Sequence, residues 1–445
     1  MRQMLGAEFG DFEQCLLQPH FRGVRFNTLK YDLSRSASSG LPITKCPFSG
    51  SGFYLDADEM SIGRSPWHHA GAIYSQEPSA MSAVTILDPQ PGERVLDMCA
   101  APGGKSTQIA AMLNGRGLLW SNEYIRKRAQ ILLSNFERMG IRNGVVSNTH
   151  PDRLAEGMNG FFDRVLVDAP CSGEGMFRRD PQAVAEWSPE HSAACAVRQL
   201  AILDSAAKCL REGGVLVYST CTFSFRENED VVAAFLDSHP AFSLEPCGVD
   251  FGRPGFDRSD RFDLTLTRRI FPMDGGEGHF AARLRKCGES VDPPVQNATG
   301  RRQNENQNEA EKRADALFSE CFGVSPYGRI RQIGESCYLL PDGMPEVKGL
   351  GVLRGGVLLG DVMKKRIEPS HALFMAAKAE ECTRVISLPH DSPELMAFLH
   401  GEEIAADGSL RGYTAVACEE TVTGFGKCSG GRLKNRYPKG LRRLN

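Results

Sequence analysis

The stretch that decides the fold reads Glu93-Arg94-Val95-Leu96-Asp97-Met98-Cys99-Ala100-Ala101-Pro102-Gly103-Gly104-Lys105-Ser106-Thr107. It contains a short apolar run, a turn of proline and two glycines, and a helical pattern that begins near Lys105. An apolar run that stops at such a turn and passes into a helical period predicts the first βα unit of an open α/β sheet. Ligands of such sheets bind at the carboxyl ends of the strands, so the turn predicts a cofactor site.

The class of cofactor is narrowed by what this turn lacks. Its ending resembles the end of a phosphate-binding P-loop, but that motif needs a glycine where the chain has Cys99. Residues 97–102 contain no Gly-x-Gly-x-x-Gly dinucleotide motif either. The remaining class is an adenosine-type ligand without a pyrophosphate. A second predicted strand, 118–122, leads to Glu123, and a carboxylate about 20 residues after the turn is the usual partner of ribose hydroxyls. A solvated carboxylate at the strand end is the alternative for Glu123.

Composition limits the class of protein and its partners. The chain has 445 residues, of which 41% are hydrophobic and 24% charged, as in ordinary globular proteins of about two to four domains. A net charge of −3 excludes a uniformly basic surface, so any RNA binding must use local patches. The 14 cysteines form no Cys-x-x-Cys pair, and neither a signal peptide nor a membrane span is expected. These features predict reduced thiols in the cytoplasm. The histidines at 68 and 69 lack a third ligand at a suitable spacing, so no metal site is predicted.

The chain divides into four predicted segments. Residues 1–75 alternate short apolar runs with turns and predict a small α+β module. Residues 76–288 alternate strands and helices, which predicts a doubly wound, mostly parallel sheet. Residues 289–314 are polar and lack aromatic residues, which is typical of a linker. Residues 315–445 contain many glycines and short β-like runs and end in a basic tail, which is either solvated or an RNA-binding patch.

Polar side chains follow three predicted strands of the sheet. Asp97 ends the first, Asp168 ends a strand at 165–167, and Cys221 follows a strand at 215–218. Because these strand ends share one edge, the three side chains predict an active site there. Cys171 follows the strand that ends at Asp168. Both Cys171 and Cys221 lie beside polar or proline turns after a strand end, where side chains are expected to face a cleft rather than the core. A single free cysteine is usually core filler, but two at one ligand-binding edge favour a chemical role.

The same residues occur in a set of motifs in a fixed order. These are Phe26-Asn27-Thr28-Leu29, Gln76-Glu77-Pro78-Ser79, Cys99 to Lys105, Asp168-Ala169-Pro170-Cys171-Ser172-Gly173, Ser219-Thr220-Cys221-Thr222, Gly278 to Leu284, and Arg432 to Pro438. In these motifs the chain resembles the Nop/Sun-type RNA cytosine-5 methyltransferases, and within them the bacterial ribosomal RNA branch, RsmF. The resemblance implies a Rossmann-like methyltransferase sheet, a small N-terminal module that faces RNA, and a C-terminal PUA-like, β-rich domain that binds RNA.

The resemblance also implies the cofactor and the residues of the site. S-adenosylmethionine would lie over the turn, with Glu123 on the ribose, Asp152 near the adenine and Asp168 beside the reacting end. The cofactor-binding residues implied are Asp97, Cys99, Ala100, Ala101, Pro102, Gly103, Gly104, Lys105, Glu123, Asp152 and Asp168. The residues around Asp152 follow the family pattern only loosely. The catalytic residues implied are Cys221 as the nucleophile, Cys171 for release, Asp168 and Lys105.

The chemistry explains why such an enzyme uses a cysteine. Carbon 5 of cytosine is a poor nucleophile, so a thiolate first adds to carbon 6 and turns the ring into an enamine, which is covalent catalysis. DNA cytosine-5 methyltransferases attack with the Pro-Cys thiol and need no second, Thr-Cys thiol. The presence of both Cys171 and Cys221 therefore favours RNA. Small-subunit ribosomal RNA is the expected substrate. Transfer RNA, or a catalytically silent RNA-binding factor in ribosome assembly, are the alternatives.

Overall fold

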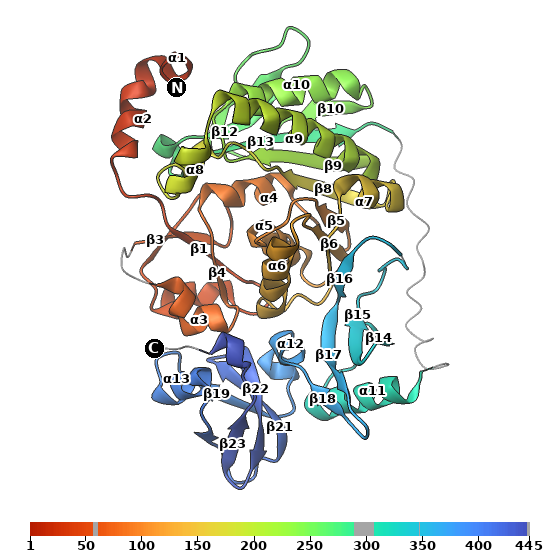
Figure 1. The fold of residues 1–445 in the computed structure, drawn as a ribbon. Helices are drawn as coiled ribbons and strands as arrows, with labels where there is room; N and C mark the ends of the chain where they lie inside the picture. Colours follow the sequence, from red (N-terminus) through yellow and green to blue (C-terminus); the bar gives the residue numbers. More distant parts are fainter. Residues whose placement is uncertain (57–60, 289–306, 347, 443–445) are drawn as a thin grey trace.

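The structure, a computed structural model, describes residues 1–56, 61–288, 307–346 and 348–442. Its centre is a 10-stranded sheet in the order β11-β12-β13-β9-β8-β5-β6-β7-β16, with β10 paired to β13 (Figure 1). The strands are β5 (Arg94–Asp97), β6 (Leu118–Asn122), β7 (Gly144–Ser147), β8 (Phe162–Asp168), β9 (Leu210–Thr220), β10 (Phe242–Glu245), β11 (Arg253–Pro254), β12 (Arg268–Ile270), β13 (His279–Lys286) and β16 (Val352–Gly355). Strands β5 to β9 are parallel, and antiparallel strands flank them on both sides.

Helices cover both faces of this sheet. They are α4 (Ser82–Leu87), α5 (Gly104–Leu113), α6 (Arg126–Arg138), α7 (Pro151–Gly157), α9 (Pro189–Cys209) and α10 (Glu229–Ser238). The short helix α8 (Pro181–Glu186) precedes α9 and buries none of its side chains. Helices α4, α5 and α6 share one hydrophobic core with the sheet, whereas α7, α9 and α10 share the other. Adjacent strand residues alternate between the two cores, as Val95 and Leu96 do. The predicted doubly wound sheet is therefore confirmed.

The N-terminal module contains a separate sheet with the order β2-β3-β1-β4. Its elements are α1 (Arg2–Leu5), α2 (Phe9–Leu16), β1 (Gly23–Phe26), β2 (Ile43–Lys45), β3 (Gly52–Leu55), α3 (Pro66–His69) and β4 (Ile73–Ser75). Arg25 of β1 is fully buried and donates through Nη2 to the Gly104 carbonyl (3.2 Å) and to Thr107 Oγ1 (2.6 Å). The predicted α+β module thus packs directly against the helix that follows the cofactor turn.

The C-terminal part consists of two small sheets. One has the order β14-β15-β17-β18 and the other β19-β21-β22-β23-β20. Their elements are α11 (Glu309–Cys321), β14 (Arg329–Ile333), β15 (Ser336–Leu340), β17 (Val357–Val362), β18 (Ile367–Pro369), α12 (His371–Met375), β19 (Val385–Leu388), α13 (Pro393–His400), β20 (Ile404–Ala405), β21 (Gly412–Cys418), β22 (Thr421–Ser429) and β23 (Arg432–Asn435). The linker predicted at 289–314 ends earlier in the structure, because Asn308 caps α11 and this helix begins at Glu309. Residues 289–306 lie outside the described residues.

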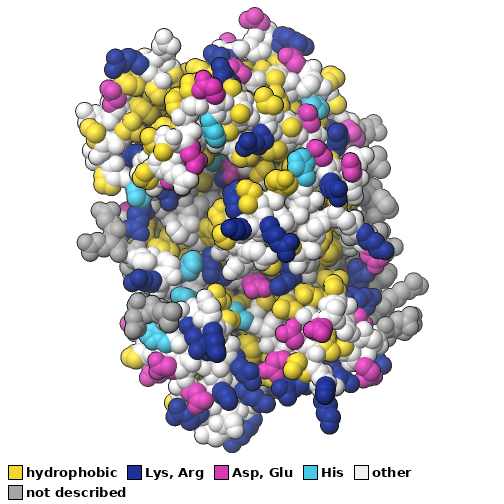
Figure 2. Space-filling view, viewed as in Figure 1, with side chains coloured by type: hydrophobic (Ala, Val, Ile, Leu, Met, Phe, Trp, Pro, Cys, Tyr) yellow, Lys and Arg dark blue, Asp and Glu magenta, His cyan; other side chains and the backbone are white. Residues whose placement is uncertain are grey.

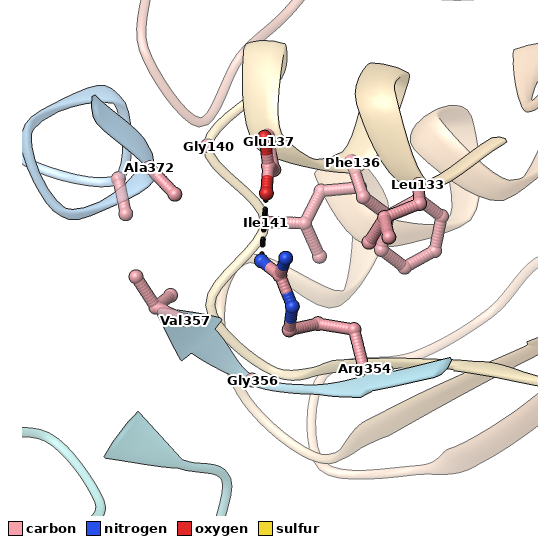
Figure 3. Close-up of a pocket in the computed structure, with 10 residues that line it drawn as sticks. Leu133, Phe136, Glu137, Gly140, Ile141, Arg354, Gly356, Val357 and Ala372 are labelled. Carbon is pink, nitrogen blue, oxygen red and sulfur yellow. Dashed lines mark hydrogen bonds and ion pairs between the residues drawn. The ribbon is translucent and has the colours of Figure 1, made fainter. Parts of the chain in front are cut away.

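One strand of the C-terminal part joins the central sheet. β16 pairs antiparallel with β7, where it satisfies the backbone groups of what would otherwise be an edge strand. Beside this junction, Arg354 of β16 donates to Glu137 of α6 at 2.7 Å, and Leu133, Ile141 and Val357 line the small apolar pocket around the pair (Figure 3). The sequence predicted a separate unit after residue 315 and gave no sign of this pairing, which joins residues about 200 positions apart.

The basic C-terminal end is part of a sheet. Residues 432–435 form β23, which lies between β22 and β20, so the predicted tail is structured over most of its length. Leu433 points into a hydrophobic core, and its neighbours Arg432 and Lys434 are exposed. This alternation is what a half-buried strand requires. A truncation before β23 would remove an inner strand of the sheet along with its charges.

Candidate active site

A carboxylate at the end of β8 is the centre of a polar cluster. Asp168 accepts hydrogen bonds from Lys105 Nζ at Oδ2 (2.7 Å) and from Ser219 Oγ at Oδ1 (2.9 Å). Burial alone would raise the pKa of Asp168, but the Lys105 ammonium outweighs it and holds the pKa below its usual value. Burial likewise opposes the charge on Lys105, and Asp168 overcomes it, so the pKa of Lys105 is raised. The two groups form an ion pair at physiological pH.

Two thiols lie at the same edge of the sheet. The Sγ atoms of Cys171, after β8, and Cys221, after β9, are 3.3 Å apart, and both residues are partly exposed. The contact with Cys221, together with burial, raises the pKa of Cys171 well above its usual value. A Cys221 thiolate would favour the protonated form of Lys105, since the two are close enough to interact electrostatically. The cluster thus combines two neighbouring thiols with the Lys105–Asp168 ion pair.

Two buried or half-buried glutamates fix the turns that carry these thiols. Glu227 is fully buried, and its carboxylate accepts from the Ser172 backbone N (2.9 Å) and from Gln199 Nε2 (3.0 Å). Glu174 accepts from the Phe223 backbone N at Oε2 (2.9 Å). Each glutamate therefore holds a residue one or two positions after a thiol. Rigid support of this kind keeps reacting groups in a productive geometry.

The cofactor turn is closed by groups from elsewhere in the chain. Gly103 has a φ of 115°, and a Cβ there would approach Leu132 Cδ1 at 3.1 Å, so only glycine fits without strain. Arg128 Nη2 donates to the Ala101 carbonyl (2.7 Å), and Asn135 Nδ2 donates to the Pro102 carbonyl (2.8 Å). Both donors come from α6. The turn is therefore preformed, with its glycine backbone free of side chains.

The carboxylates predicted to hold the cofactor differ in their surroundings. Asp97 is buried, and burial raises its pKa to about 7. Its Oδ2 accepts from Ser106 Oγ (2.7 Å), whereas Oδ1 has no hydrogen-bond partner within the described part of the chain. A buried acceptor without a donor suits an amino group of a ligand. Glu123, after β6, accepts from the Ile125 backbone N (2.8 Å) and pairs with Arg128 (3.5 Å).

Cys99 and Asp152 are two further residues that the sequence predicts to bind the cofactor. Cys99 follows β5 within the turn, and burial raises the pKa of its thiol well above the usual value. Asp152 lies in the first turn of α7, where its carboxylate accepts from Ser205 Oγ of α9 (2.6 Å) and its side chain is largely exposed. The described contacts of Asp152 are therefore made with α7 and α9, away from the turn.

Several residues of the cluster were not predicted from the sequence. His279, at the start of β13, is buried with Nε2 3.9 Å from Asp168 Oδ1. Burial lowers the pKa of His279 to about 3, so its ring is neutral. The others are Arg25, Arg128, Glu174, Ser219 and Glu227. The sequence contained a signal for Ser219, because it lies near the end of β9, two residues before Cys221. It contained no signal for Glu227.

A basic face lies on the C-terminal sheet, which is the sheet with the order β19-β21-β22-β23-β20. Lys427 of β22 stands directly opposite Lys434 of β23, and both side chains are exposed. Arg432 and Arg436 continue the row but pair with Glu403 (3.4 Å) and Glu368 (3.1 Å). Figure 2 shows Lys and Arg side chains gathered over the lower part of the molecule, where Figure 1 places β21 to β23. Like charges directly opposite are destabilising, so this face suits a polyanion.

The described residues contain neither a candidate membrane span nor a candidate metal centre. No described helix combines the length and the apolar character needed to cross a bilayer. In the same residues, no group of three or more histidine, cysteine, aspartate or glutamate side chains is arranged to hold a metal ion.

Comparison with known proteins identifies the family. Four family models match: 16S rRNA methyltransferase RsmB/F (residues 84–285), N-terminal domain of 16S rRNA methyltransferase RsmF (1–78), RsmF rRNA methyltransferase first C-terminal domain (317–376) and methyltransferase RsmF PUA domain (386–443). The C-terminal part is therefore matched as two units, in agreement with its two sheets.

Curated relatives match along nearly the whole chain. A ribosomal RNA small subunit methyltransferase F from Vibrio cholerae is 32% identical, covering 98% of this chain and 94% of the relative. One from Escherichia fergusonii is 33% identical, covering 97% and 92%. Among solved structures, a methyltransferase homolog from Pyrococcus horikoshii is 31% identical with a TM-score of 0.55, covering 64% of this chain and 92% of that one. NSun6 from Pyrococcus horikoshii with SFG shares the fold, with a TM-score of 0.54 and 23% identity over 65% of this chain and 97% of that one. The chain belongs to the 16S rRNA methyltransferase RsmB/F family.

Proposed function

We propose that this protein transfers the methyl group of S-adenosylmethionine to carbon 5 of a cytosine in small-subunit ribosomal RNA. S-adenosylmethionine is the methyl donor of the family, and the relatives are named for the small-subunit RNA. The observation that carries the cytosine-5 reaction is the pair of thiols 3.3 Å apart beside the Lys105–Asp168 ion pair. Methylation at a nitrogen or a hydroxyl oxygen needs no thiol, whereas carbon 5 of cytosine needs a covalent adduct.

Cys221 is the attacking group in this proposal. Its thiolate adds to carbon 6 of the cytosine and makes carbon 5 nucleophilic. Lys105 is close enough to Cys221 to interact with the thiolate charge, and it is held by Asp168 at 2.7 Å. The thiolate, rather than the thiol, is the nucleophile, and Lys105 supplies a neighbouring positive charge.

Cys171 acts when the enzyme releases the product. Release requires a base, here water, to take the proton from carbon 5. The electron pair of that C–H bond then forms the double bond to carbon 6, and the Cys221 sulfur leaves carbon 6 as a thiolate. The raised pKa of Cys171 keeps its proton on the sulfur. From 3.3 Å, this S–H is able to donate to the departing Cys221 sulfur and to stabilise its charge.

Asp168 recognises the pyrimidine edge. Its pKa is held low by Lys105, so it is ionised and accepts a hydrogen bond from the protonated ring nitrogen as positive charge develops there. Ser219 and Lys105 each donate a hydrogen bond to a different oxygen of Asp168, which fixes the orientation of the carboxylate. The carboxylate therefore needs little rearrangement during the reaction.

The methyl donor fits the turn between β5 and α5. It supplies an electrophilic methyl group when bound. Asp97 offers its unpaired Oδ1 to the amino group of the donor, and Glu123 suits the ribose hydroxyls. Residues Cys99 to Lys105 provide the backbone of the site, with Gly103 and Gly104 leaving room for it. Asp152 is kept as the residue proposed for the adenine side.

Labelled methyl transfer tests the function. Small ribosomal subunits, naked small-subunit RNA and bulk transfer RNA from cells lacking this gene are incubated with the protein and labelled S-adenosylmethionine. Bisulfite sequencing then locates any 5-methylcytosine. Incorporation into small-subunit RNA at a cytosine supports the proposal. Incorporation only into transfer RNA reassigns the substrate, and cofactor binding without incorporation into any RNA supports a silent assembly factor.

A further inference from the structure

One tryptophan remains exposed next to the catalytic turns. The chain contains 3 tryptophans, of which Trp67 and Trp120 are buried, at 3% and 0% exposed. Trp187, between α8 and α9, keeps 39% of its surface exposed. Large aromatic side chains are usually buried, and an exposed one that is held in place is enriched at binding surfaces.

The Trp187 ring is held in one orientation. Its Nε1 donates to Glu174 Oε1 at 3.1 Å, and Phe177 contacts it edge to face, with ring centroids 6.5 Å apart and an interplanar angle of 87°. The polar atom of the indole is therefore already satisfied by the protein. What the side chain offers to a ligand is its aromatic surface, and little conformational freedom is left to lose on binding.

The same glutamate connects Trp187 to the nucleophile. Glu174 Oε2 accepts from the Phe223 backbone N (2.9 Å) and from Thr222 Oγ1 (3.0 Å), the two residues that follow Cys221. Next to Glu174, the Gly175 backbone N donates to the Cys221 carbonyl at 2.8 Å. The tryptophan thus belongs to the same hydrogen-bonded unit as the reacting thiol. Figure 1 shows α8, which leads into Trp187, above the sheet of the N-terminal module.

The chemistry at Cys221 determines what kind of ligand arrives beside Trp187. A cytosine whose carbon 6 reaches a thiol must leave its base stack, and the next base along the strand then loses a stacking partner. Aromatic side chains replace such stacking in single-stranded RNA. We propose that Trp187 is a stacking platform for the unpaired base adjacent to the target cytosine. This inference rests on the proposed function and adds a binding site for a second nucleotide.

Fluorescence provides the first test, because Trp187 is the exposed tryptophan. The wild-type protein is titrated with the RNA that it methylates, with S-adenosylhomocysteine in place of the methyl donor to prevent turnover. Stacking on a base quenches tryptophan emission, so the RNA should quench the exposed component. In Trp187→Phe, which keeps an aromatic ring but no indole, that quenching should disappear while RNA binding persists. Equal quenching in the two proteins would overturn the proposal.

A combined change in protein and RNA provides the second test. Trp187→Ala should bind the substrate RNA roughly 5- to 150-fold more weakly, the range for removal of one base–aromatic stack. An abasic nucleotide placed on either side of the target should weaken wild-type binding by a similar factor at one of the two positions. At that position, Trp187→Ala should bind the abasic and the normal RNA equally well. Independent, multiplying losses of affinity would contradict a contact between this base and the tryptophan.

The controls separate this inference from the proposed function. Val197→Ala removes another exposed apolar side chain, on α9, and should leave affinity and methylation unchanged. If wild-type protein methylates its RNA but Trp187 substitutions change neither affinity nor quenching, the platform is wrong and the function stands. If wild-type protein transfers no methyl group to a cytosine, the proposed function fails first.

Discussion

The sulfur atoms of Cys171 and Cys221 lie 3.3 Å apart, although 50 residues separate them along the chain. They follow neighbouring parallel strands, β8 and β9, whose carboxyl ends share one edge of the sheet. Asp168 and Ser219 are paired in the same register just before them. The two thiols are therefore brought together by the sheet itself, and we propose different roles for them.

Substitution of each thiol separates these roles. Cys221→Ala cannot form the adduct with carbon 6 and should lose turnover while still binding RNA and cofactor. Cys171→Ala should still attack and transfer the methyl group but release the product slowly, so the protein stays joined to its RNA. After incubation with RNA and S-adenosylmethionine, denaturing electrophoresis should show a thiol-linked species for Cys171→Ala and none for Cys221→Ala. An adduct with Cys221→Ala would reverse the assignment.

The residues at the strand ends could be predicted from the sequence because they follow a local rule. Asp97 and Asp168 come directly after short apolar runs, and Cys221 follows the run 215–218 after Ser219 and Thr220. Parallel strands deliver such residues to one edge. The supports of the site obey no such rule. Glu227 follows β9, yet its partners, Ser172 and Gln199, come from the loop after β8 and from α9. Contacts of this kind depend on packing between distant segments, as does the pairing of β16 with β7.

Asp97 provides a test of the cofactor site. Asp97→Asn keeps the shape of the side chain but removes the charge that would bind the donor's ammonium group. Since a hydrogen bond to a charged group contributes about 1.5–3 kcal/mol, the affinity for S-adenosylmethionine should fall by roughly 10- to 150-fold. Calorimetric titration measures the change, and Asp407→Asn, in the exposed turn after β20, is the control. S-adenosylmethionine, but not ATP, should raise the wild-type melting temperature. Unchanged affinity in Asp97→Asn would exclude this contact.

The paired lysines of the C-terminal sheet should bind RNA phosphates. Lys427→Gln and Lys434→Gln should each weaken RNA binding and reduce the salt dependence by roughly 0.7 to 0.9 log unit for each phosphate interaction that the substitution removes. Removing one lysine also relieves the repulsion across β22 and β23, so the free protein should not become less stable. Filter binding at several salt concentrations measures the slope. Lys312→Gln, on α11, removes an exposed charge elsewhere; an equal effect there would point to a nonspecific influence of net charge.

Buried neutral histidines should make the protein sensitive to acid. Burial lowers the pKa of His279 and of His371 to about 3, from an unfolded value near 6.5. Between these values the unfolded chain binds a proton at each site and the folded protein does not, so stability is fully present above about pH 6.5 and falls as the pH drops.

His371→Phe tests this effect away from the active site. The variant retains an aromatic ring beside Tyr437, which contacts the His371 ring with centroids 5.2 Å apart. It removes one group that takes up a proton on unfolding. The decline in unfolding free energy below pH 6 should therefore become shallower by about 1.4 kcal/mol per pH unit. His20→Gln, at an exposed position, should leave the slope as it is. Denaturant unfolding from pH 4.5 to 7.5 measures all three proteins. A slope in His371→Phe equal to that of the wild type would mean that His371 takes up its proton in the folded protein, through an opening of the packing between α12 and the C-terminal sheet.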